Sequence, residues 1–258
     1  MQSPSIIVIT GASSGLGAAL ALAYAGPGIT LGLVGRNEAR LNAVAEQCAT
    51  RGALAIPGTA DTRKAETMRR WLTEFDADHP IDLIIANAGI AAGLTQGTES
   101  EPQVRDIFMT NVGGVLNTVL PVIPLMQARR RGQIAVMSSL AGIRGLPSCP
   151  AYSASKNAVR ALGEGLRGTL KAEGIRVNVI CPGYIHTPMT EVNTFPMPFI
   201  MSAEKAAGII KSGLAANRSR IAFPLALYLP LLLVSALPLW LTDAFFAALP
   251  RKTTKEKA

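Results

Sequence analysis

Tyr152 and Lys156 stand four residues apart in the segment PAYSASKNAVRAL, residues 150–162. Side chains at positions i and i+4 of a helix lie on one face, so the phenol and the ammonium group would be neighbours. A tyrosine has a pKa of about 10, and a nearby cation favours its phenolate form. The pair therefore predicts acid–base chemistry, but other helices carry such pairs by chance, so the elements that position this one must decide.

Short apolar runs alternate with helical segments along the 258 residues, of which 49% are hydrophobic and 16% charged. The predicted strands cover 5–10, 29–35, 53–58, 81–87, 132–139, 175–183 and, at one edge, 220–224. The predicted helices cover 14–25, 37–50, 62–77, 103–130, 150–172 and 202–217. Most runs are continuously apolar, which is typical of strands covered on both faces. We expect an α/β fold, a doubly wound parallel sheet of Rossmann type with helices on both faces, whose ligands bind at the carboxyl ends of the strands.

Composition excludes several classes of function. The net charge is +8, but the basic residues are scattered and aromatic residues are few, so we exclude nucleic acid as a partner and keep anionic cofactors and lipid head groups. Cys48, Cys149 and Cys181 form no CxxC pair, and the two histidines are far apart, so we expect neither a disulfide framework nor a metal site. The N-terminus has no signal-peptide pattern, which predicts a cytoplasmic protein, with membrane association left open.

The first predicted strand ends in TGASSGLG, residues 10–17, and a helix follows. Gly11 would permit the tight turn, Gly15 would let the backbone approach a phosphate, and Gly17 would allow close packing of helix and strand. The N-terminus of the helix favours an anionic pyrophosphate. This position after the first strand predicts a dinucleotide site.

The end of the second strand indicates which dinucleotide binds. A cofactor without a 2′-phosphate calls for an acidic residue there, but the sequence is LVGRNEAR, with Gly35 and Arg36 at that place. An arginine fork suits a phosphate, so we expect NADP(H) to be preferred over NAD(H), with Arg36 and Ser13 nearest the 2′-phosphate and Asn37 a weaker candidate. The alternative is a solvated arginine that begins a helix.

With TGASSGLG, ANAGI at 86–90, Asn111, MSSLAG at 137–142, YSASK at 152–156 and PGYIHTPM at 182–189 in this order, the chain resembles the short single-domain branch of the short-chain dehydrogenases/reductases. The likeness covers about residues 5–224. It implies Tyr152 as general acid or base, supported by the field of Lys156, and Ser139 as hydrogen-bond partner of the substrate oxygen, with Ser138 as the runner-up. Asn111, in a helix distorted by glycines, would hold a relay water through its amide or its backbone carbonyl; the alternative is an asparagine that caps the helix or faces solvent.

The resemblance also implies a set of residues along the cofactor. Asp61 would contact the adenine, although as a helix N-cap it would look the same. Thr187 would contact the nicotinamide amide, with the backbone of Ile185 beside it. The expected cofactor-binding set, besides Arg36 and Ser13, is Gly11, Ser14, Gly15, Leu16, Gly17, Asp61, Asn87, Ala88, Gly89, Tyr152, Lys156, Pro182, Gly183, Ile185 and Thr187.

Residues 188–202 correspond to the mobile substrate lid of that family, within a catalytic domain of residues 1–224. The lid is rich in adaptable apolar side chains, namely Met189, Phe195, Met197, Phe199, Ile200 and Met201. They favour an apolar ketone or secondary alcohol as substrate. The alternative is that they only pack the lid onto the body.

Residues 225–258 form an apolar C-terminal extension with a basic end, beyond the reach of the resemblance. The stretch 221–242 has no charge and meets the length rule for a membrane span, but Pro224, Pro230 and Pro238 interrupt it. Two readings compete with a span. The first is a pair of short helices on a membrane surface, anchored by Trp240 and the cations Arg218, Arg220, Arg251 and Lys252. The second is packing over the substrate cleft or against a sister subunit.

Three functions follow, in order of preference. The first is an NADP(H)-dependent oxidoreductase that acts on a small apolar carbonyl or alcohol; the others are a nucleotide-binding scaffold without turnover and a membrane-associated interaction protein. The retained Asn111, Ser139, Tyr152 and Lys156 favour the first, because a binder needs the glycine loop but no acid. The resemblance also implies a homodimer or homotetramer, and Gly163, Gly165 and Gly168 would allow close helix contact or lie on a solvent face.

Overall fold

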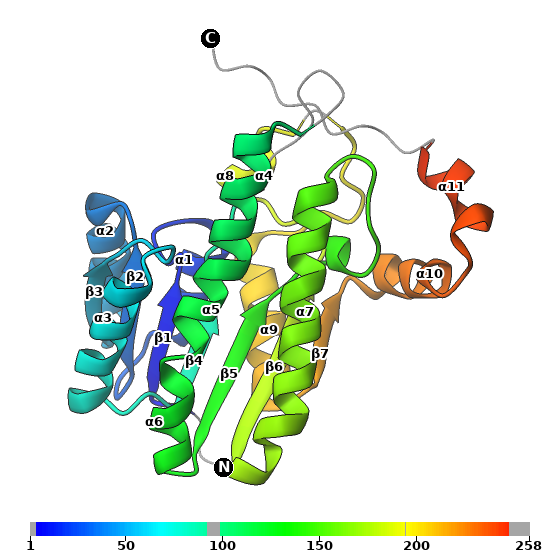
Figure 1. Ribbon diagram of the computed structural model, residues 1–258. Helices are drawn as coiled ribbons and strands as arrows, with labels where there is room; N and C mark the ends of the chain where they lie inside the picture. The colour runs from blue at the N-terminus through cyan, green and yellow to red at the C-terminus, as the bar shows by residue number, and fades with distance from the viewer. Residues whose placement is uncertain (1–3, 92–98, 194, 248–258) are drawn as a thin grey trace.

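A seven-stranded sheet of parallel strands forms the centre of the computed structural model, which describes residues 4–91, 99–193 and 195–247 (Figure 1). The strand order is β3-β2-β1-β4-β5-β6-β7. The strands are β1 (Ile6–Thr10), β2 (Thr30–Gly35), β3 (Leu54–Thr59), β4 (Leu83–Ala86), β5 (Gly132–Met137), β6 (Ile175–Pro182) and β7 (Arg220–Phe223). The predicted doubly wound α/β fold is confirmed, including the edge strand at 220–224.

Helices cover both faces of the sheet and bury a separate apolar core on each. On one face lie α1 (Gly15–Tyr24), α2 (Glu38–Ala49) and α9 (Ala203–Ala215). On the other lie α3 (Ala65–Asp78), α5 (Gly114–Val119), α6 (Val122–Ala128) and α7 (Pro150–Leu170). Successive strand residues alternate between the two cores, as Ile7 and Ile9 do against Val8. This double burial explains why the strands are continuously apolar.

The helix predicted over 103–130 is broken into pieces. It begins as α4 (Glu101–Phe108), widens into a π-helical turn η1 (Met109–Gly113), and continues as α5 and α6. Gly113 and Gly114 follow Asn111 in the wide turn, and Pro121 separates the last two helices because it lacks an N–H group. The expected distortion at Asn111 is therefore present.

The strand order reverses between β1 and β4, which are neighbours in the sheet although two strands lie between them in sequence. The chain segments that leave these strands are tied together at the carboxyl edge. The Thr10 hydroxyl accepts hydrogen bonds from the Asn87 and Ala88 N–H groups, each at 3.1 Å, and the Asn87 side chain donates to the Thr10 carbonyl at 2.9 Å. A topological switch point of this kind is where open α/β sheets bind ligands.

Two short helices follow β7, α10 (Leu225–Ser235) and α11 (Leu239–Ala247). They contain 11 and 9 residues and are separated by a non-helical turn, so neither is long enough to cross a membrane. The predicted alternative of a single membrane span at 221–242 is therefore wrong. Pro230 lies inside α10 without ending it. Among the described residues, the helical stretch Glu101–Ala128 alone is long and apolar enough to cross a membrane, and half of its best window is buried in the body of the protein. Arg251 and Lys252 lie outside the described residues.

Candidate active site

A cavity of about 980 Å³ opens along the carboxyl ends of the strands and runs from α2 to α10. Every residue of the expected cofactor-binding set lines it, as does Ser139. Asn111 is fully buried and does not line the cavity. The expectation that ligands bind at the carboxyl ends of the strands agrees with the position of this cleft.

The glycine loop at one end has the shape that an anionic dinucleotide requires. Gly11 has φ +68°, and a Cβ there would lie 2.9 Å from the Ala88 Cα. A Cβ on Gly17 would collide with the Gly11 carbonyl, so this glycine serves close packing within the loop and against Asn87. Ser14 begins α1 without capping it through its side chain, and no acidic residue lies in the first turn. The N-terminal N–H groups of α1 therefore suit a pyrophosphate.

Two arginines line the outer end of the cleft, Arg36 and Arg40. Both are exposed, and Asn37 between them accepts a hydrogen bond from the Arg40 N–H at 2.9 Å as the N-cap of α2. Arg40 was missed in the sequence analysis, although it stands one helical turn after Arg36. The outer end of the cleft thus carries positive charge, which suits an anionic ligand group.

Asp61 lines the cleft near these arginines but is paired. Its carboxylate accepts two hydrogen bonds from the Arg63 guanidinium, at 2.7 and 2.9 Å, which hold the pKa of Asp61 below its usual value. The alternative that Asp61 caps α3 is wrong, because Lys64 is the N-cap of that helix. The Asp61 charge therefore offsets little of the positive charge of Arg36 and Arg40.

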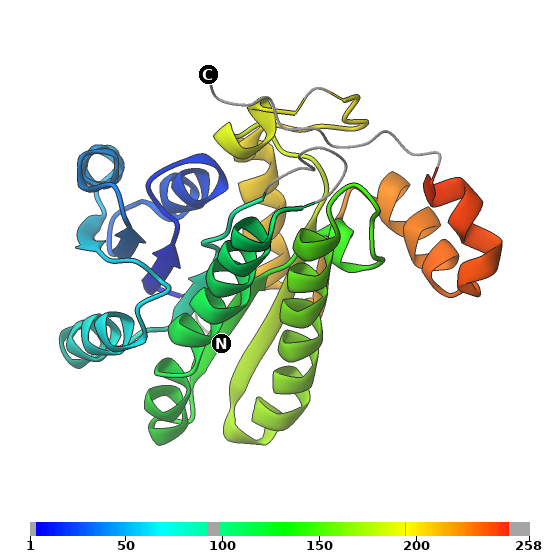
Figure 2. The ribbon, with the colours of Figure 1, turned by 45° about the horizontal axis from the view of Figure 1, so that its top comes forward.

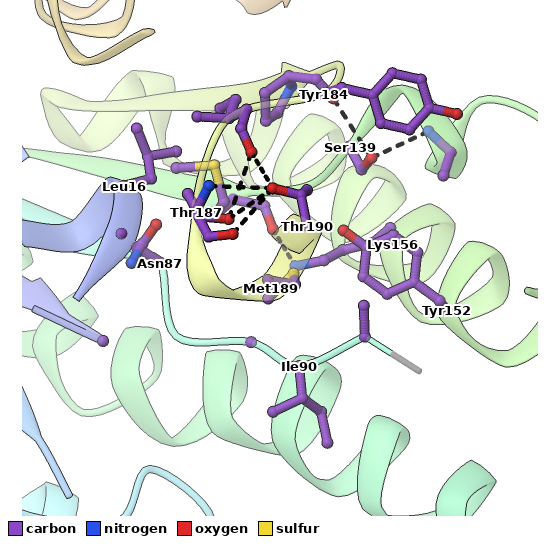
Figure 3. Close-up of a pocket in the computed structure, with 18 of the residues that line it drawn as sticks. Leu16, Asn87, Ile90, Ser139, Tyr152, Lys156, Tyr184, Thr187, Met189 and Thr190 are labelled. Atoms are coloured by element: carbon purple, nitrogen blue, oxygen red, sulfur yellow. Dashed lines mark hydrogen bonds between the residues drawn. The ribbon is translucent and has the colours of Figure 1, made fainter. Parts of the chain in front are cut away.

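Tyr152, Lys156 and Ser139 meet at the middle of the cleft (Figure 3). The Lys156 Nζ lies 5.8 Å from the Tyr152 ring centre and donates to the Met137 carbonyl at 2.9 Å. The Ser139 hydroxyl accepts from the Ala141 N–H at 3.1 Å, donates to the Pro182 carbonyl at 3.4 Å, and lies close enough to Tyr152 to oppose the rise of its pKa. The neighbouring Ser138 instead donates to the Lys156 carbonyl at 2.7 Å, so it anchors α7 to the end of β5. Of the two serines, Ser139 is therefore the one whose hydroxyl meets the tyrosine.

Burial dominates the electrostatics of this pair. It raises the pKa of Tyr152 to about 12, against the opposing effect of the Ser139 hydroxyl. Burial also lowers the pKa of Lys156 to about 8. In the protein alone the pKa of Tyr152 is therefore raised rather than lowered, because the loss of water on burial dominates. A tyrosine that stays protonated at neutral pH is suited to donate a proton.

Asn111 lies behind the cleft wall and uses its whole side-chain amide. Its Oδ1 accepts from the Ile90 N–H at 2.8 Å, and its Nδ2 donates to the Ile90 carbonyl at 2.9 Å and to Ser155 at 3.0 Å. A Cβ on Gly89 would meet both the Asn111 Oδ1, at 3.1 Å, and the Lys156 Nζ, at 3.2 Å. Asn111 thus fixes the segment after β4 beside the lysine, and the alternative of a capping or solvent-facing asparagine is wrong, because Asn111 lies inside the π-helical turn and is fully buried.

The lid closes over the cleft between β6 and α9. Ile185 and Met201 form a β-bridge, and Thr187 begins the short helix α8 (Pro188–Glu191) with Thr190 as its capping partner. Of the apolar lid residues, Met189 and Phe195 line the cavity, whereas Phe199 is 61% exposed and Met201 packs against the core beside α9. Only part of the lid therefore presents apolar surface to a substrate; Thr194 lies outside the described residues.

The wall of the cavity opposite the glycine loop is built from segments that lie far apart in the sequence. The cavity residues that the sequence analysis did not assign to the site are Arg40, Ile90, Leu146, Cys149, Tyr184, Thr190, Leu227, Pro230, Leu231 and Val234, among others. The last four belong to α10, which supports the expectation that the tail packs over the cleft. Arg40 could have been found by its helical spacing from Arg36, but the others had no local signal.

A dinucleotide fits this cleft from the arginines to the tyrosine, and at its inner end stands a side chain that can exchange a proton. Such a cleft in a Rossmann-type sheet is typical of nicotinamide-dependent oxidoreductases. The chain belongs to the short-chain dehydrogenases: the model of that family, described as "short chain dehydrogenase", matches residues 5–195. The resemblance inferred from the motifs is thereby confirmed, and the protein is an oxidoreductase with a nicotinamide cofactor.

Two relatives are similar over most of the chain. An uncharacterized oxidoreductase of Myxococcus xanthus is 37% identical over 238 residues, which cover 92% of this chain and 94% of the relative. The ketoacyl reductase HetN of Nostoc is 32% identical over 212 residues, which cover 82% and 72% of the two chains.

Solved structures agree in fold. A short-chain dehydrogenase from Mycobacterium paratuberculosis bound to NAD superposes with a TM-score of 0.75 at 26% identity and covers 84% of this chain and 94% of its own. A protein from Beutenbergia cavernae, described as an NAD(P)-dependent gluconate 5-dehydrogenase with bound NADP, gives 0.75 and 26% with coverage of 84% and 92%.

Proposed function

We propose that the protein is an NADP(H)-dependent reductase that transfers hydride from the nicotinamide to an apolar ketone and, in reverse, oxidises a secondary alcohol. The observation that carries this proposal is the position of Tyr152, between the glycine loop and the apolar end of one continuous cavity. In reduction, NADPH, a proton and the ketone give NADP⁺ and the alcohol; when bound, the cofactor supplies the hydride.

Tyr152 donates the proton to the carbonyl oxygen of the substrate. Its pKa of about 12 keeps it protonated at neutral pH, and Ser139 lines the same part of the cavity, so that two hydroxyl groups face the substrate oxygen. Ser139 stabilises the charge that develops on the substrate oxygen, and Lys156 holds its ammonium group beside the Tyr152 ring. The Asn111 side chain positions Ile90, and the proposed relay water would be held by the Asn111 backbone carbonyl, because both side-chain N–H groups are used.

The preference for NADP(H) rests on the charge at the outer end of the cleft. Arg36 and Arg40 line it, and the nearest carboxylate, Asp61, is held by Arg63. Ser13 lies next to Gly35, because a Cβ added to Gly35 would be 3.2 Å from the Ser13 Oγ. Since Gly35 directly precedes Arg36, Ser13 lies beside the arginines. One structural relative holds NADP and another NAD, so the residues of this chain carry the argument.

An apolar substrate suits the inner end of the cavity. Most of the side chains that line it there are apolar, namely Leu140, Leu146, Tyr184, Met189, Phe195, Leu227, Leu231 and Val234, and the polar Ser148, Thr190 and Asn193 stand among them. No charged side chain of the described residues lines this end. A charged substrate would lose its hydration there without compensation.

We keep a homodimer or homotetramer as our expectation for assembly. Gly163 packs against the sheet, where an added Cβ would lie 2.5 Å from Val136, so it does not serve helix–helix contact. An added Cβ on Gly165 or Gly168 would meet no atom within 4 Å, which leaves room for a sister helix on the outer side of α7.

Oxidation of NADPH in the presence of a panel of ketones tests the proposal. Tyr152→Phe should abolish turnover and leave NADPH affinity within about twofold, because the ring remains. Ser139→Ala should lower kcat by about a hundredfold, whereas Ser138→Ala, whose hydroxyl faces α7, should fold less stably but keep its turnover. Equal turnover in wild type and Tyr152→Phe would refute the assignment of the acid.

The cofactor preference has its own test. The double variant R36A/R40A should weaken NADPH binding by about a hundredfold and NADH binding by less than about threefold, since only the former has a 2′-phosphate. Arg69→Ala serves as control, because Arg69 is exposed on α3 away from the cleft. Equal losses for the two cofactors would contradict the proposed preference.

A further inference from the structure

Helix α10 has two apolar faces with different surroundings. Leu227, Leu231 and Val234 face the cavity and are partly buried. On the opposite side, Leu225 and Leu233 are 61% and 72% exposed. Helix α10 is therefore a wall one helix thick, with the substrate end of the cavity on its inner side.

The exposed face continues onto α11, and together they form what we name the tail face. Its members are Leu225, Leu229, Leu232, Leu233, Leu237, Leu239, Trp240 and Leu241, each at least 38% exposed. Figure 2 shows α10 and α11 at one side of the molecule, beyond β7, with no other described element outside them. The other exposed large apolar side chains of the described residues are spread over the body.

The two helices are fixed to the body by polar contacts on their inner side. Arg220 of β7 donates to the Tyr228 hydroxyl at 2.9 Å. Arg144, in the segment after Ser139, donates to Thr242 of α11 at 2.7 Å, and Thr242 is 4% exposed. The tail face is thus presented in a defined orientation by the same segment that shapes the cavity.

The chemistry of the tail face fits a lipid surface. Protein interfaces carry about one hydrogen bond per 100–200 Å², yet all side chains of the tail face are apolar apart from the Trp240 indole, which is 76% exposed. Residues 221–242 contain no charge, the acidic Asp243 of α11 forms an ion pair with Arg144 at 3.8 Å, and residues 251–258 carry four basic residues and one acidic residue. Short apolar helices with a tryptophan and flanking cations are typical of segments that lie in the interface of anionic membranes.

We propose that the tail face docks on an anionic phospholipid membrane and that α10 separates this membrane from the substrate end of the cavity. The substrate class that follows is a carbonyl compound with a long hydrocarbon chain, which partitions into the bilayer. This second part rests on the proposed function, whereas the docking does not.

Flotation with vesicles of phosphatidylcholine and phosphatidylglycerol in a two-to-one ratio tests the docking. The full-length protein should float with these vesicles, and L233E/W240E should reduce the bound fraction about tenfold. The control L54E/L120E changes two leucines that are 54% and 51% exposed on the body and should float like wild type. Trp240 emission should shift to shorter wavelength with vesicles, and Trp240→Phe should lack this shift, because Trp71 stacks on Phe75 at 5.2 Å.

Two results would overturn the docking. One is a wild type that stays unbound and forms dimers that L233E/W240E dissociates, which would make the tail face an interface between copies of the chain. The other is binding that L233E/W240E and L54E/L120E leave equally intact.

Turnover of two methyl ketones separates the substrate class from the proposed function. With NADPH, 2-octanone in solution should be reduced equally by wild type and L233E/W240E, because neither residue lines the cavity. With 2-hexadecanone in vesicles, the variant should lose about tenfold in kcat/KM. Equal rates of wild type and L233E/W240E on the ketone in vesicles would refute the substrate class. If wild type turned over neither ketone, the proposed function would be refuted, and flotation would still decide the docking.

Discussion

Replacement of Lys156 by methionine should stabilise the protein at neutral pH while it abolishes turnover. Lys156 is 4% exposed, and burial lowers its pKa from 10.5 to about 8. Each unit of such a difference corresponds to 1.36 kcal/mol, so burial of the charge costs about 3 kcal/mol. Methionine has a similar length and no charge, and it loses the hydrogen bond to the Met137 carbonyl, worth about 1 kcal/mol. The free energy of unfolding should rise by about 2 kcal/mol at pH 7.

The pH dependence has a definite sign. Below pH 8 the lysine is charged in the folded and in the unfolded chain, and the wild type bears the full cost. Between pH 8 and 10.5 the folded protein releases the proton while the unfolded chain keeps it, so the stability of the wild type rises with pH. The advantage of Lys156→Met should therefore shrink through this window and reverse above it, where only the loss of the hydrogen bond, about 1 kcal/mol, remains.

Urea unfolding of both proteins from pH 6.5 to 10.5, in the presence of a reductant, measures this difference. Lys211→Met is the matched control, because Lys211 also donates to a backbone carbonyl, that of Ala23 at 2.7 Å, but is exposed. Its effect on stability should not vary over the same range. A Lys156→Met protein that is less stable than wild type at pH 7, or a constant difference across the range, would refute the reasoning.

Two further predictions concern positions around the site. Gly163→Ala should destabilise the protein by about 1–3 kcal/mol in urea unfolding, because an added Cβ would lie 2.5 and 2.7 Å from Val136 and Val179. Gly165→Ala should stabilise it by up to about 1 kcal/mol, because an added Cβ there would meet no atom within 4 Å. A change of the same sign in both variants would contradict this packing. Asn111→Ala should lower the free energy of unfolding by about 3 kcal/mol, since it leaves both backbone groups of Ile90 without their partner. Asn117→Ala loses one hydrogen bond to the Thr62 carbonyl and should lower it by about 1 kcal/mol. Equal losses would show that Asn111 does not hold this segment.

The cofactor half of the site could be predicted from the sequence because local backbone geometry builds it. Gly11 and Gly17 act within a turn between one strand and the next helix, and Arg36 follows the end of a strand. Each of these signals is contained in a few consecutive residues, and the parallel sheet then brings the strand ends to one edge. The switch between β1 and β4 needed only the order of strands that such a fold adopts.

The substrate half could not be predicted, because its residues meet only through tertiary packing. Leu146, Tyr184 and Leu231 come from three separate segments. The tail posed a further difficulty, since α10 is apolar all round and its sequence shows no periodicity that separates an inner from an outer face. The direction of the Tyr152 pKa was also missed, because spacing reveals a cation nearby but not the loss of water that outweighs it.

Residues 138–144 connect the three parts of the molecule that these proposals involve. Ser138 fixes the helix that carries Tyr152, Ser139 meets the tyrosine in the cleft, and Arg144 holds α11 through Thr242. Gly142 permits this close approach, since an added Cβ would lie 2.7 Å from the carbonyl carbon of Lys156. The position of the proton donor and the orientation of the tail therefore depend on one short segment, so the tail is part of the structure that shapes the substrate end of the cavity.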